Sequence, residues 1–492
     1  MDDVSSMELC VQEYILQPLF ATSKSSKLDE ALKILIEVSR TADGRLDLAA
    51  NNILFTALQL CQSLSYPPGG HLLLLSLKFL RNLCAGEIAN QNSFIEQNGV
   101  ETVSSILGSI EFSSDLGYRI ICMGLQVLGN VVLAGKEHQR AVWHQFFPEE
   151  FARIARVRGR EACDTLCMIL YTCCDGNGGL IRELCGDRGL HIVAEIVQIA
   201  SAVGIGEDWL KLLLTRICLE EFHFQPLFSK LSLYRFEKSA DIKCGDDHFV
   251  SEQSFLLSFL SEILNGWICE ITISSDFALC VLGIFKKAVE VVNSVPRSEF
   301  GLPTGSTAVD VLGYSLIILR DICAQDGAEG GKEEMVDVVH SLICGGLLEM
   351  LLGLLRDLEP PALIRKAIKQ VENHDGTSSY SSKICPYKGF RRDIVAVIGN
   401  CAYHRKHVQD EIRQKNGILL LLQQCVNDEH NTFLREWGIW SVRNLLEGNA
   451  ENQRIVAELE LQASVDVPEI AGLGLRVEVD QRTRRAKLVN AL

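Results

Sequence analysis

Two distant stretches of this chain are nearly copies of each other, and they decide the fold. Residues 80–91 read Leu-Arg-Asn-Leu-Cys-Ala-Gly-Glu-Ile-Ala-Asn-Gln, and residues 442–453 read Val-Arg-Asn-Leu-Leu-Glu-Gly-Asn-Ala-Glu-Asn-Gln. In each stretch an Asn ends an apolar run and a Gln follows nine residues later. Self-similarity at a fixed register is typical of a repeat array, and repeat arrays bind partners far more often than they catalyse reactions.

Two further copies of the pattern give the repeat length. Asn130 is followed by Gln139, and Asn400 is followed by Gln409. Asn82 and Asn130 lie 48 residues apart, and Asn400 and Asn444 lie 44 apart. The same apolar run recurs with another residue in the Asn position at Glu37, Thr172, Arg216, Glu262 and Asp321. Steps of roughly 40–47 residues predict armadillo or HEAT units.

We therefore predict an all-α fold, an armadillo/HEAT-like α-solenoid that forms a right-handed superhelix of about nine repeats. The predicted organisation has armadillo-like repeats over 1–372 and a flexible, turn-rich loop or linker over 373–389. Further repeats follow over 390–465 and a tail over 466–492. Leu475, Val477 and Val479 alternate with charged residues in that tail, which indicates either an extended segment packed on the last repeat or a disordered end.

The composition excludes several classes of function. The formal charge of −16 argues against nucleic acid as a ligand, because phosphate binding needs a basic surface. No apolar run is long enough to predict a membrane span, and the acidic start lacks the apolar segment of a secretory signal. We therefore expect a cytoplasmic protein whose 18 cysteines stay reduced and act as small apolar residues.

Signals for catalysis are weak throughout the sequence. Phosphate-binding, hydrolase and zinc-protease motifs are not found, and neither is a Cys-x-x-Cys pair. We expect a protein that is not an enzyme, with no catalytic residues, no cofactor and no metal.

The repeated Asn residues are the first candidates for partner binding. Asn82, Asn130, Asn400 and Asn444 could each donate and accept hydrogen bonds with the backbone of an extended peptide. The alternative is that each Asn caps its own inter-helix loop. Trp440 stands four residues before Asn444, a spacing used by peptide-binding armadillo proteins, but Lys78, Gln126 and Ala396 replace it elsewhere.

A local excess of positive charge is the second candidate. Residues 383–415 carry eight Lys and Arg against three acidic residues, in a chain that is acidic overall. This pattern indicates either a solvated helix face or a surface that binds an acidic partner. The candidate residues are Lys388, Arg391, Arg392, Arg405 and Lys406.

Residues 386–462 carry the most specific pattern. Pro-Tyr-Lys-Gly-Phe-Arg-Arg-Asp-Ile at 386–394 precedes Ile398-Gly399-Asn400, and Phe-Leu-Arg-Glu-Trp at 433–437 precedes the last repeat of the Asn pattern. This segment resembles the C-terminal domain of the ataxin-10 family. The resemblance implies a cytoplasmic, non-enzymatic armadillo protein linked to cell division, cell survival or signalling through protein partners, and a possible homo-oligomer.

Our first hypothesis is therefore a scaffold or adaptor that binds protein partners, either as peptides or as acidic surfaces. The alternative is a direct regulator of a client enzyme, of the nucleotide-exchange or glycosyltransferase-activating type.

Overall fold

A computed structural model describes residues 25–111, 114–204, 206, 208–238, 249–267, 271–292, 298–325, 337–365, 383–459, 475–479 and 486–490. Most of the predicted linker at 373–389 and much of the predicted tail lie outside these residues. The chain divides into two compact units, Met1–Phe277 and Ala278–Leu492. The boundaries predicted at 372, 389 and 465 stay predictions.

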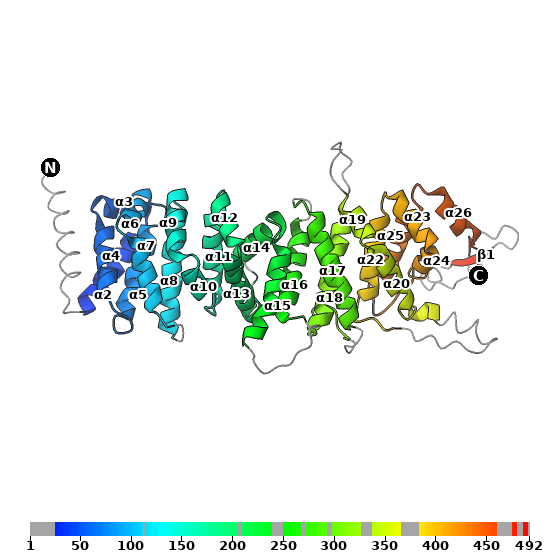
Figure 1. Ribbon diagram of the computed structural model, residues 1–492, viewed down its shortest axis with the longest axis horizontal. Helices are drawn as coiled ribbons and strands as arrows, with labels where there is room; N and C mark the ends of the chain where they lie inside the picture. Colours follow the sequence, from blue (N-terminus) through cyan, green and yellow to red (C-terminus); the bar gives the residue numbers. More distant parts are fainter. Residues whose placement is uncertain are drawn as a thin grey trace. The chain divides into compact units, whose positions relative to one another are not determined.

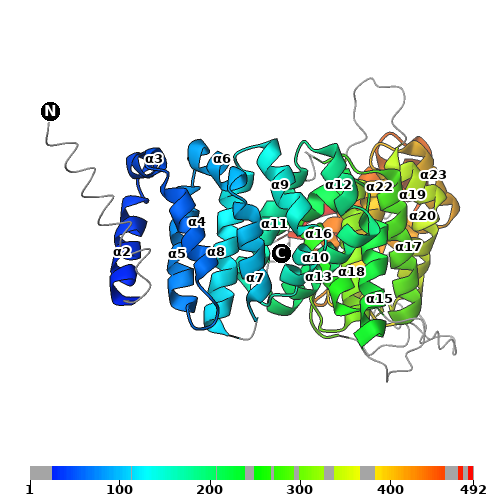
Figure 2. The ribbon, with the colours of Figure 1, turned by 60° about the vertical axis from the view of Figure 1, so that its left-hand side comes forward.

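The first unit consists of helices (Figures 1 and 2). They are α2 (Ser25–Val38), α3 (Ala42–Ala50), α4 (Ile53–Ser63), α5 (Gly70–Leu83), α6 (Ile88–Glu96), α7 (Gly99–Ser109), α8 (Asp115–Val132), α9 (Lys136–Phe146), α10 (Glu149–Ala155), α11 (Arg160–Cys174), α12 (Gly178–Leu184), α13 (Asp187–Val203), α14 (Asp208–Thr215), the π-helix η1 (Arg216–Glu220), α15 (Phe224–Lys238) and α16 (Ser251–Trp267).

Helix α17 (Ser275–Val292) contains the boundary between the units. The second unit continues with α18 (Thr307–Ala324), α19 (Val338–Cys344), α20 (Leu347–Asp357), α22 (Phe390–Ala402), α23 (Lys406–Gln414), α24 (Gly417–Leu422), α25 (Leu434–Leu446) and α26 (Ala450–Glu458). Strands β1 (Leu475–Val479) and β2 (Ala486–Asn490) form an antiparallel pair in the predicted tail. The predicted all-α solenoid is confirmed, with this short strand pair added to it.

One helix in each repeat carries the Asn position, and these helices pack on one another in order. We call them the ladder helices: α2, α5, α8, α11, α14 and α16 in the first unit, and α18, α22 and α25 in the second. In α14 the Asn position, Arg216, is the first residue of the π-helix η1 that continues it. Within the first unit α2 packs on α5, α5 on α8, α8 on α11, α11 on α14, and α14 on α16. Within the second unit α18 packs on α22, and α22 packs on α25. The α2, α5 and α8 ribbons lie side by side in both views (Figures 1 and 2).

Local sequence explains where ladder helix α8 begins and which side it buries. The Ser114 hydroxyl accepts a hydrogen bond from the backbone N–H of Gly117, which caps the first turn. Ile121, Leu125, Leu128 and Val132 follow at helical spacing and are at most 1% exposed. Burying each such side chain contributes about 1.5–3 kcal/mol, so this stripe fixes the side that α8 turns to its neighbours.

Asn-Gly pairs join two short helices within a repeat. A Gly that follows a helical run commonly ends the helix. Instead Asn98 takes the left-handed conformation, with a φ of 57°, and Gly99 begins α7. A Cβ at Gly99 would lie 2.5 Å from the Phe94 ring, so the glycine allows that ring to pack against the backbone. Asn416, with a φ of 56°, precedes Gly417 in the same way.

Among the described residues, no single helix has the length and apolar character needed to cross a membrane. The bent pair Val338–Cys344 and Leu347–Asp357 meets these criteria only when its two helices are taken together across a 61° bend.

Candidate protein-binding surface

Each repeated Asn side chain joins two consecutive ladder helices. In each case the Asn Nδ2 atom donates a hydrogen bond to a backbone carbonyl oxygen of the preceding ladder helix. The pairs are Asn82 to Ile36 (3.2 Å), Asn130 to Arg81 (2.8 Å), Asn400 to Arg320 (3.1 Å) and Asn444 to Gly399 (3.0 Å). The Asn positions of those preceding helices are Glu37, Asn82, Asp321 and Asn400, and each acceptor is the residue directly before one of them. The hydrogen bonds therefore confirm the repeat register at these positions.

The repeated Gln side chains, and not the Asn side chains, cap the loop at the end of each of these ladder helices. Gln91 donates from Nε2 to the carbonyl of Cys84, at the end of its own ladder helix, and to the carbonyl of Asn130 in the next one (3.0 and 2.8 Å). Gln409 likewise reaches Ala402 and Asn444 (3.3 and 2.8 Å). Each of these two Gln side chains therefore donates a hydrogen bond to a carbonyl at the C-terminal end of its own ladder helix, where no helical N–H is available, and another to the next ladder helix along the chain.

These contacts use the amide nitrogens of the four Asn side chains, whereas the Asn444 Oδ1 atom is buried with no hydrogen-bond partner among the described residues. Asn82 and Asn400 are 8% exposed, Asn444 is 1% exposed, and Asn130 is half-buried. Their amide nitrogens are occupied by backbone carbonyls of a neighbouring repeat. Binding of a partner peptide by these four residues stays a prediction.

The predicted basic cluster is largely paired inside the second unit. Arg391 is 3% exposed and donates to the side chain of Gln424 and to the carbonyl of Glu359. Arg392 forms an ion pair with Asp393 (2.7 Å), and Arg405 forms one with Asp337 (3.1 Å). Burial lowers the pKa of Arg391. Arg391 therefore presents little of its charge to a partner.

Lys388, Lys406 and Trp440 do reach the surface. Both lysines are exposed, and Trp440 is 45% exposed with the Arg443 guanidinium 4.8 Å from its ring centroid. Arg443 over an indole face is a cation–π contact. Partner binding by these three residues, as by Arg391, Arg392 and Arg405, stays a prediction.

A buried polar cluster explains two residues of the Tyr-Lys-Gly-Phe-Arg-Arg-Asp run at 387–393. The Tyr387 hydroxyl donates to Asp393 (2.9 Å), and both residues are 1% exposed. Burial raises the pKa of Asp393, with the Arg392 charge acting against that shift. Burial, and then the Asp393 charge, raises the pKa of Tyr387. These groups fix the start of α22 and serve the fold.

A larger surface, which the sequence did not predict, lies on the ladder helices of the first unit. Each ladder helix from α5 to α16 turns one half-exposed or exposed stripe outward. We call this surface the ladder face and define it by Lys78, Arg81, Arg119, Met123, Gln126, Glu161, Met168, Tyr171, Trp209, Lys211, Phe255 and Glu262. Most of these residues stand one, four, seven or eleven positions before the Asn position, so reading those positions on each predicted helix could have found the stripes.

Polar side chains link neighbouring helices across the ladder face. Arg81 donates to the side-chain oxygen of Gln126 (3.0 Å), and Gln126 donates to the carboxylate of Glu161 (2.9 Å). Lys211 forms an ion pair with Glu262 (2.8 Å). The chain of contacts runs over α5, α8 and α11 and resumes between α14 and α16.

Large apolar side chains lie between these polar links. Tyr171 and Trp209 pack with ring centroids 6.0 Å apart, joining α11 to α14. The tip of Met168 lies against Gly129 of α8, since a Cβ at that glycine would be 2.6 Å from the Met168 methyl. Arg81 reaches within 3.9 Å of the Met123 sulfur. The ladder face is therefore an amphipathic surface that alternates aromatic or Met side chains with charged groups.

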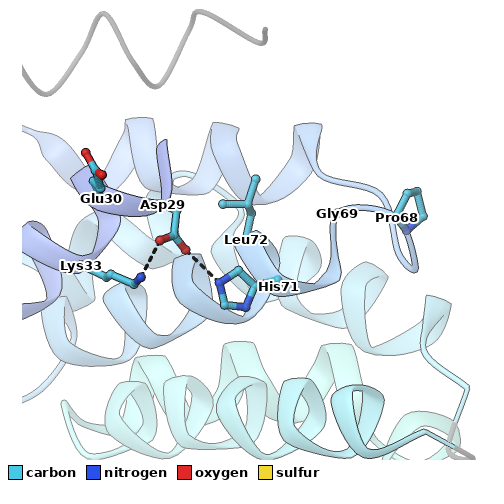
Figure 3. Close-up of a pocket in the computed structure, with 7 residues that line it drawn as sticks. All are labelled: Asp29, Glu30, Lys33, Pro68, Gly69, His71 and Leu72. Carbon is cyan, nitrogen blue, oxygen red and sulfur yellow. Dashed lines mark hydrogen bonds and ion pairs between the residues drawn. The ribbon is translucent and has the colours of Figure 1, made fainter. Parts of the chain in front are cut away.

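One shallow pocket of about 450 Å³ lies between α2 and the start of α5 (Figure 3). The Asp29 carboxylate at its centre accepts hydrogen bonds from Lys33 (2.6 Å) and His71 (2.8 Å). Those bonds, the one from Lys33 first, lower the pKa of Asp29. Most of the lining is exposed or half-exposed, and the Asp29 carboxylate is already held by Lys33 and His71, so we do not assign a catalytic role to these residues.

Cysteines in the described part of the chain are free thiols, and most are buried. Burial raises the pKa of Cys61 and of Cys84 to about 12. Cys323 and Cys401 place their sulfurs 3.5 Å apart between α18 and α22. Among the described residues, no group of three or more His, Cys, Asp or Glu side chains is placed to hold a metal ion.

Comparison with protein families identifies the C-terminal part of the chain. Residues 390–488 match the spinocerebellar ataxia type 10 protein domain. This range includes α22 to α26, β1 and part of β2. It covers the segment in which the sequence resemblance was found.

Similarity to curated proteins extends much further along the chain. Ataxin-10 of Bos taurus is 25% identical over 412 residues, which cover 81% of this chain and 78% of that protein. Ataxin-10 of Homo sapiens is 24% identical over 411 residues, with the same coverage. The ataxin-10 homolog of Dictyostelium discoideum is 36% identical over 94 residues, 19% of this chain and 15% of that protein.

Among solved structures, a designed armadillo repeat protein in complex with the peptide (KR)4 covers 51% of this chain and is 14% identical, with a TM-score of 0.33. An engineered protein covers 54% of the chain at 13% identity, with a TM-score of 0.37. The fold therefore rests on the chain's own helices and their register. Residues 390–488 therefore carry the spinocerebellar ataxia type 10 protein domain, and the chain is similar to ataxin-10 proteins over most of its length.

Proposed function

We propose that this protein is a non-enzymatic scaffold of the cytoplasm that binds segments of partner proteins on its ladder face. The observation that carries the proposal is the row of half-exposed Met123, Met168, Tyr171, Trp209 and Phe255 on successive helices of one unit. The family's link to cell division, survival and signalling gives the expected setting for such binding.

The chemistry of the ladder face supports protein recognition. Trp, Tyr and Arg are the residues that most often dominate protein interfaces, and Met side chains adapt to different partners. Arg81, Gln126 and Glu161 offer donors and acceptors beside the apolar groups. A peptide that crosses these helices could bury apolar side chains while it exchanges polar contacts at the rim.

A photocrosslinking experiment on the full-length chain tests the proposal. Benzoylphenylalanine replaces Met168 in one variant and Ser105 in a matched variant, because Ser105 is exposed on α7 and lies outside the ladder face. We expect covalent partner adducts from position 168 and few from position 105. Trp209→Ala should reduce the adduct at position 168 by about tenfold or more, as for loss of an interface hot spot.

Equal adduct yields at positions 168 and 105, or yields at 168 that do not respond to Trp209→Ala, would overturn the ladder face as the binding surface. Far-UV circular dichroism of each variant should match that of the parent chain, which shows that the altered yield reflects the surface.

A further inference from the structure

Helix α2 is the first ladder helix in the described part of the chain, and one of its sides is apolar and exposed (Figure 2). Ile34 is 60% exposed and Val38 is 42% exposed. They stand three residues before and one residue after the Asn position, which is Glu37 in this helix. Ala31, one turn before Ile34 on the same side, is half-exposed. We call Ala31, Ile34 and Val38 the α2 stripe.

The registers of Ile34 and Val38 are buried in all the other ladder helices, with η1 counted as the continuation of α14. Three residues before the Asn position, and at most 4% exposed, are Phe79, Val127, Ile169, Leu213, Phe259, Ile318, Val397 and Ser441. One residue after it, and at most 3% exposed, are Leu83, Val131, Cys173, Ile217, Ile263, Ile322, Cys401 and Leu445. The α2 stripe is therefore a surface that is covered in every other repeat.

One neighbour that covers these registers is the preceding ladder helix. The Ser441 hydroxyl of α25 donates to the carbonyl of Val395 in α22 (2.9 Å). The Cys401 sulfur of α22 lies 3.5 Å from the Cys323 sulfur of α18. Both contacts point backward along the chain, so in α2 the corresponding side faces the residues that come before it.

The other neighbour is the helix directly before each ladder helix in the sequence. The register of Ala31 is held by Gly124 in α8 and by Gly438 in α25. A Cβ at Gly124 would lie 2.8 Å from the Leu107 side chain of α7, and one at Gly438 would lie 2.7 Å from the Gln424 carbonyl oxygen, just after α24. Helix α4 likewise packs on α5. A helix before α2 would therefore reach the α2 stripe from the Ala31 side.

The sequence before α2 has the pattern of such a helix, in residues that lie outside the described part of the chain. Ser5 and Glu8 have the Ser-x-x-Glu spacing of a capping box, which predicts a helix start. Pro18 predicts a helix end at the residue before it. The apolar residues Met7, Val11 and Ile15 follow at four-residue steps and form one stripe along that helix.

Sequence spacing also gives this segment the place that α7 has in its repeat. Ile15 precedes Ala31 by 16 residues, and Leu107 precedes Gly124 by 17. Residues 18–24 would join the segment to α2, and they are seven, against five residues between α7 and α8 and six between α4 and α5. Connections of about two to eight residues are usual between antiparallel helices.

We propose that residues 6–17 form a helix that packs antiparallel on α2 and covers the α2 stripe. A helix of this length is about 18 Å long and spans most of α2, with Ile15 near Ala31 and Met7 near Val38. Its short connection holds it beside α2 at an effective concentration on the order of millimolar. A partner helix or a second copy of the chain must displace it before binding there. This contact is independent of the ladder face.

Photocrosslinking of the purified full-length chain tests the contact. Benzoylphenylalanine replaces Ile34 in one variant and Lys33 in a matched variant, because Lys33 is exposed on another side of α2. Mass spectrometry identifies the residues that are joined. We expect adducts within one chain that join position 34 to residues 6–17, and few such adducts from position 33.

A charge on the apolar stripe of the segment should break the contact. Val11→Asp should lower the adduct yield at position 34 about tenfold or more, because a carboxylate would be buried without a partner. It should also speed hydrogen exchange of the α2 amides by about tenfold, since α2 loses a packed neighbour. Exchange of α8 and α11 should stay as in the parent chain, which shows that the variant is folded.

Gln12→Asp is the matched control, because Gln12 lies about 100° around the predicted helix from Val11. This change should leave both the adduct yield and the exchange of α2 unaltered. Adducts from position 34 between two chains would show that a second copy occupies the α2 stripe. That outcome, equal yields at positions 34 and 33, or equal effects of Val11→Asp and Gln12→Asp would each overturn the proposal.

Discussion

The side-chain amide of Asn444 donates a 3.0 Å hydrogen bond to the backbone carbonyl of Gly399. Gly399 directly precedes Asn400, whose own amide reaches the carbonyl of Arg320 in the ladder helix before it. Repetition of this bond sets the register in which one repeat packs on the next. Asn, with an amide donor on a short side chain, suits a carbonyl of the adjacent helix at this distance.

Removing the amide should destabilise the junction between α22 and α25. Asn444→Ala loses a buried hydrogen bond, so we expect the free energy of unfolding of the second unit to fall by about 1–3 kcal/mol. Urea denaturation followed by hydrogen exchange of α22 and α25 measures this change. Gln453→Ala is the control, because Gln453 is exposed and bonds only within its own repeat in the described residues. An equal loss in both variants would contradict a special role for Asn444.

A methyl group at Gly399 should separate the same two helices. Its Cβ would lie 2.3 Å from the Ser441 hydroxyl oxygen and 3.0 Å from the Ser441 Cα, which is backbone that cannot rotate away. We expect Gly399→Ala to cost about 1–3 kcal/mol of stability, as overpacking of a close contact does.

Gly353→Ala in α20 is the matched control, since a Cβ there meets nothing within 4 Å. That change should leave stability unchanged or raise it by up to about 1 kcal/mol, because Ala favours a helix over Gly. Thermal unfolding of both variants is the measurement, and a harmless Gly399→Ala would refute the close approach.

Asp321 occupies an Asn position, and replacing it with Asn should stabilise the protein at neutral pH. Its Oδ1 accepts from Arg320, as Asn82 Oδ1 accepts from Arg81, while its Oδ2 is buried with no hydrogen-bond partner among the described residues. Burial raises the pKa of Asp321 above its ordinary value of 3.8. Asp321→Asn removes a buried charge that is only partly compensated, for an expected gain of about 1 kcal/mol.

The same substitution has a defined pH dependence. Because the folded-state pKa of Asp321 is raised, the folded protein binds this proton more tightly than the unfolded chain does. Stability from this group is greatest below the unfolded pKa and falls as the pH rises through the folded pKa. The advantage of Asp321→Asn in denaturation midpoint should therefore grow from acid toward pH 7. An advantage that is constant with pH would show that the carboxyl is not perturbed.

Thiol reactivity should divide the cysteines by burial. Cys344 is exposed, whereas Cys167 and Cys218 are buried. Burial raises the pKa of Cys218, and a hydrogen bond from the Cys167 thiol to Cys163, followed by burial, raises the pKa of Cys167. Only a thiolate reacts with iodoacetamide, so Cys344 should be labelled at least about tenfold faster than the two buried thiols. Mass spectrometry before and after unfolding measures this, and similar rates in the folded state would contradict the burial.

The sequence predicted the repeat register well and the surface poorly. Asn82, Asn130, Asn400 and Asn444 could be aligned because one side chain makes the same bond at each junction. The role of Arg391 could not be read in this way, since a charged residue in a basic run is normally solvated and only its contact with Glu359 and Gln424 shows otherwise. The ladder face was missed because its residues differ from helix to helix and share only a position.

Binding of protein partners through the ladder face of the first unit can be tested by lysine crosslinking of the complex isolated from cells. Lys78 and Lys211 belong to the ladder face, whereas Lys136 is exposed at the start of α9, outside it. We predict that crosslinks to partner proteins concentrate at Lys78 and Lys211 and that Lys136 contributes few. A map in which Lys136 carries partner crosslinks while Lys78 and Lys211 carry none would contradict the account.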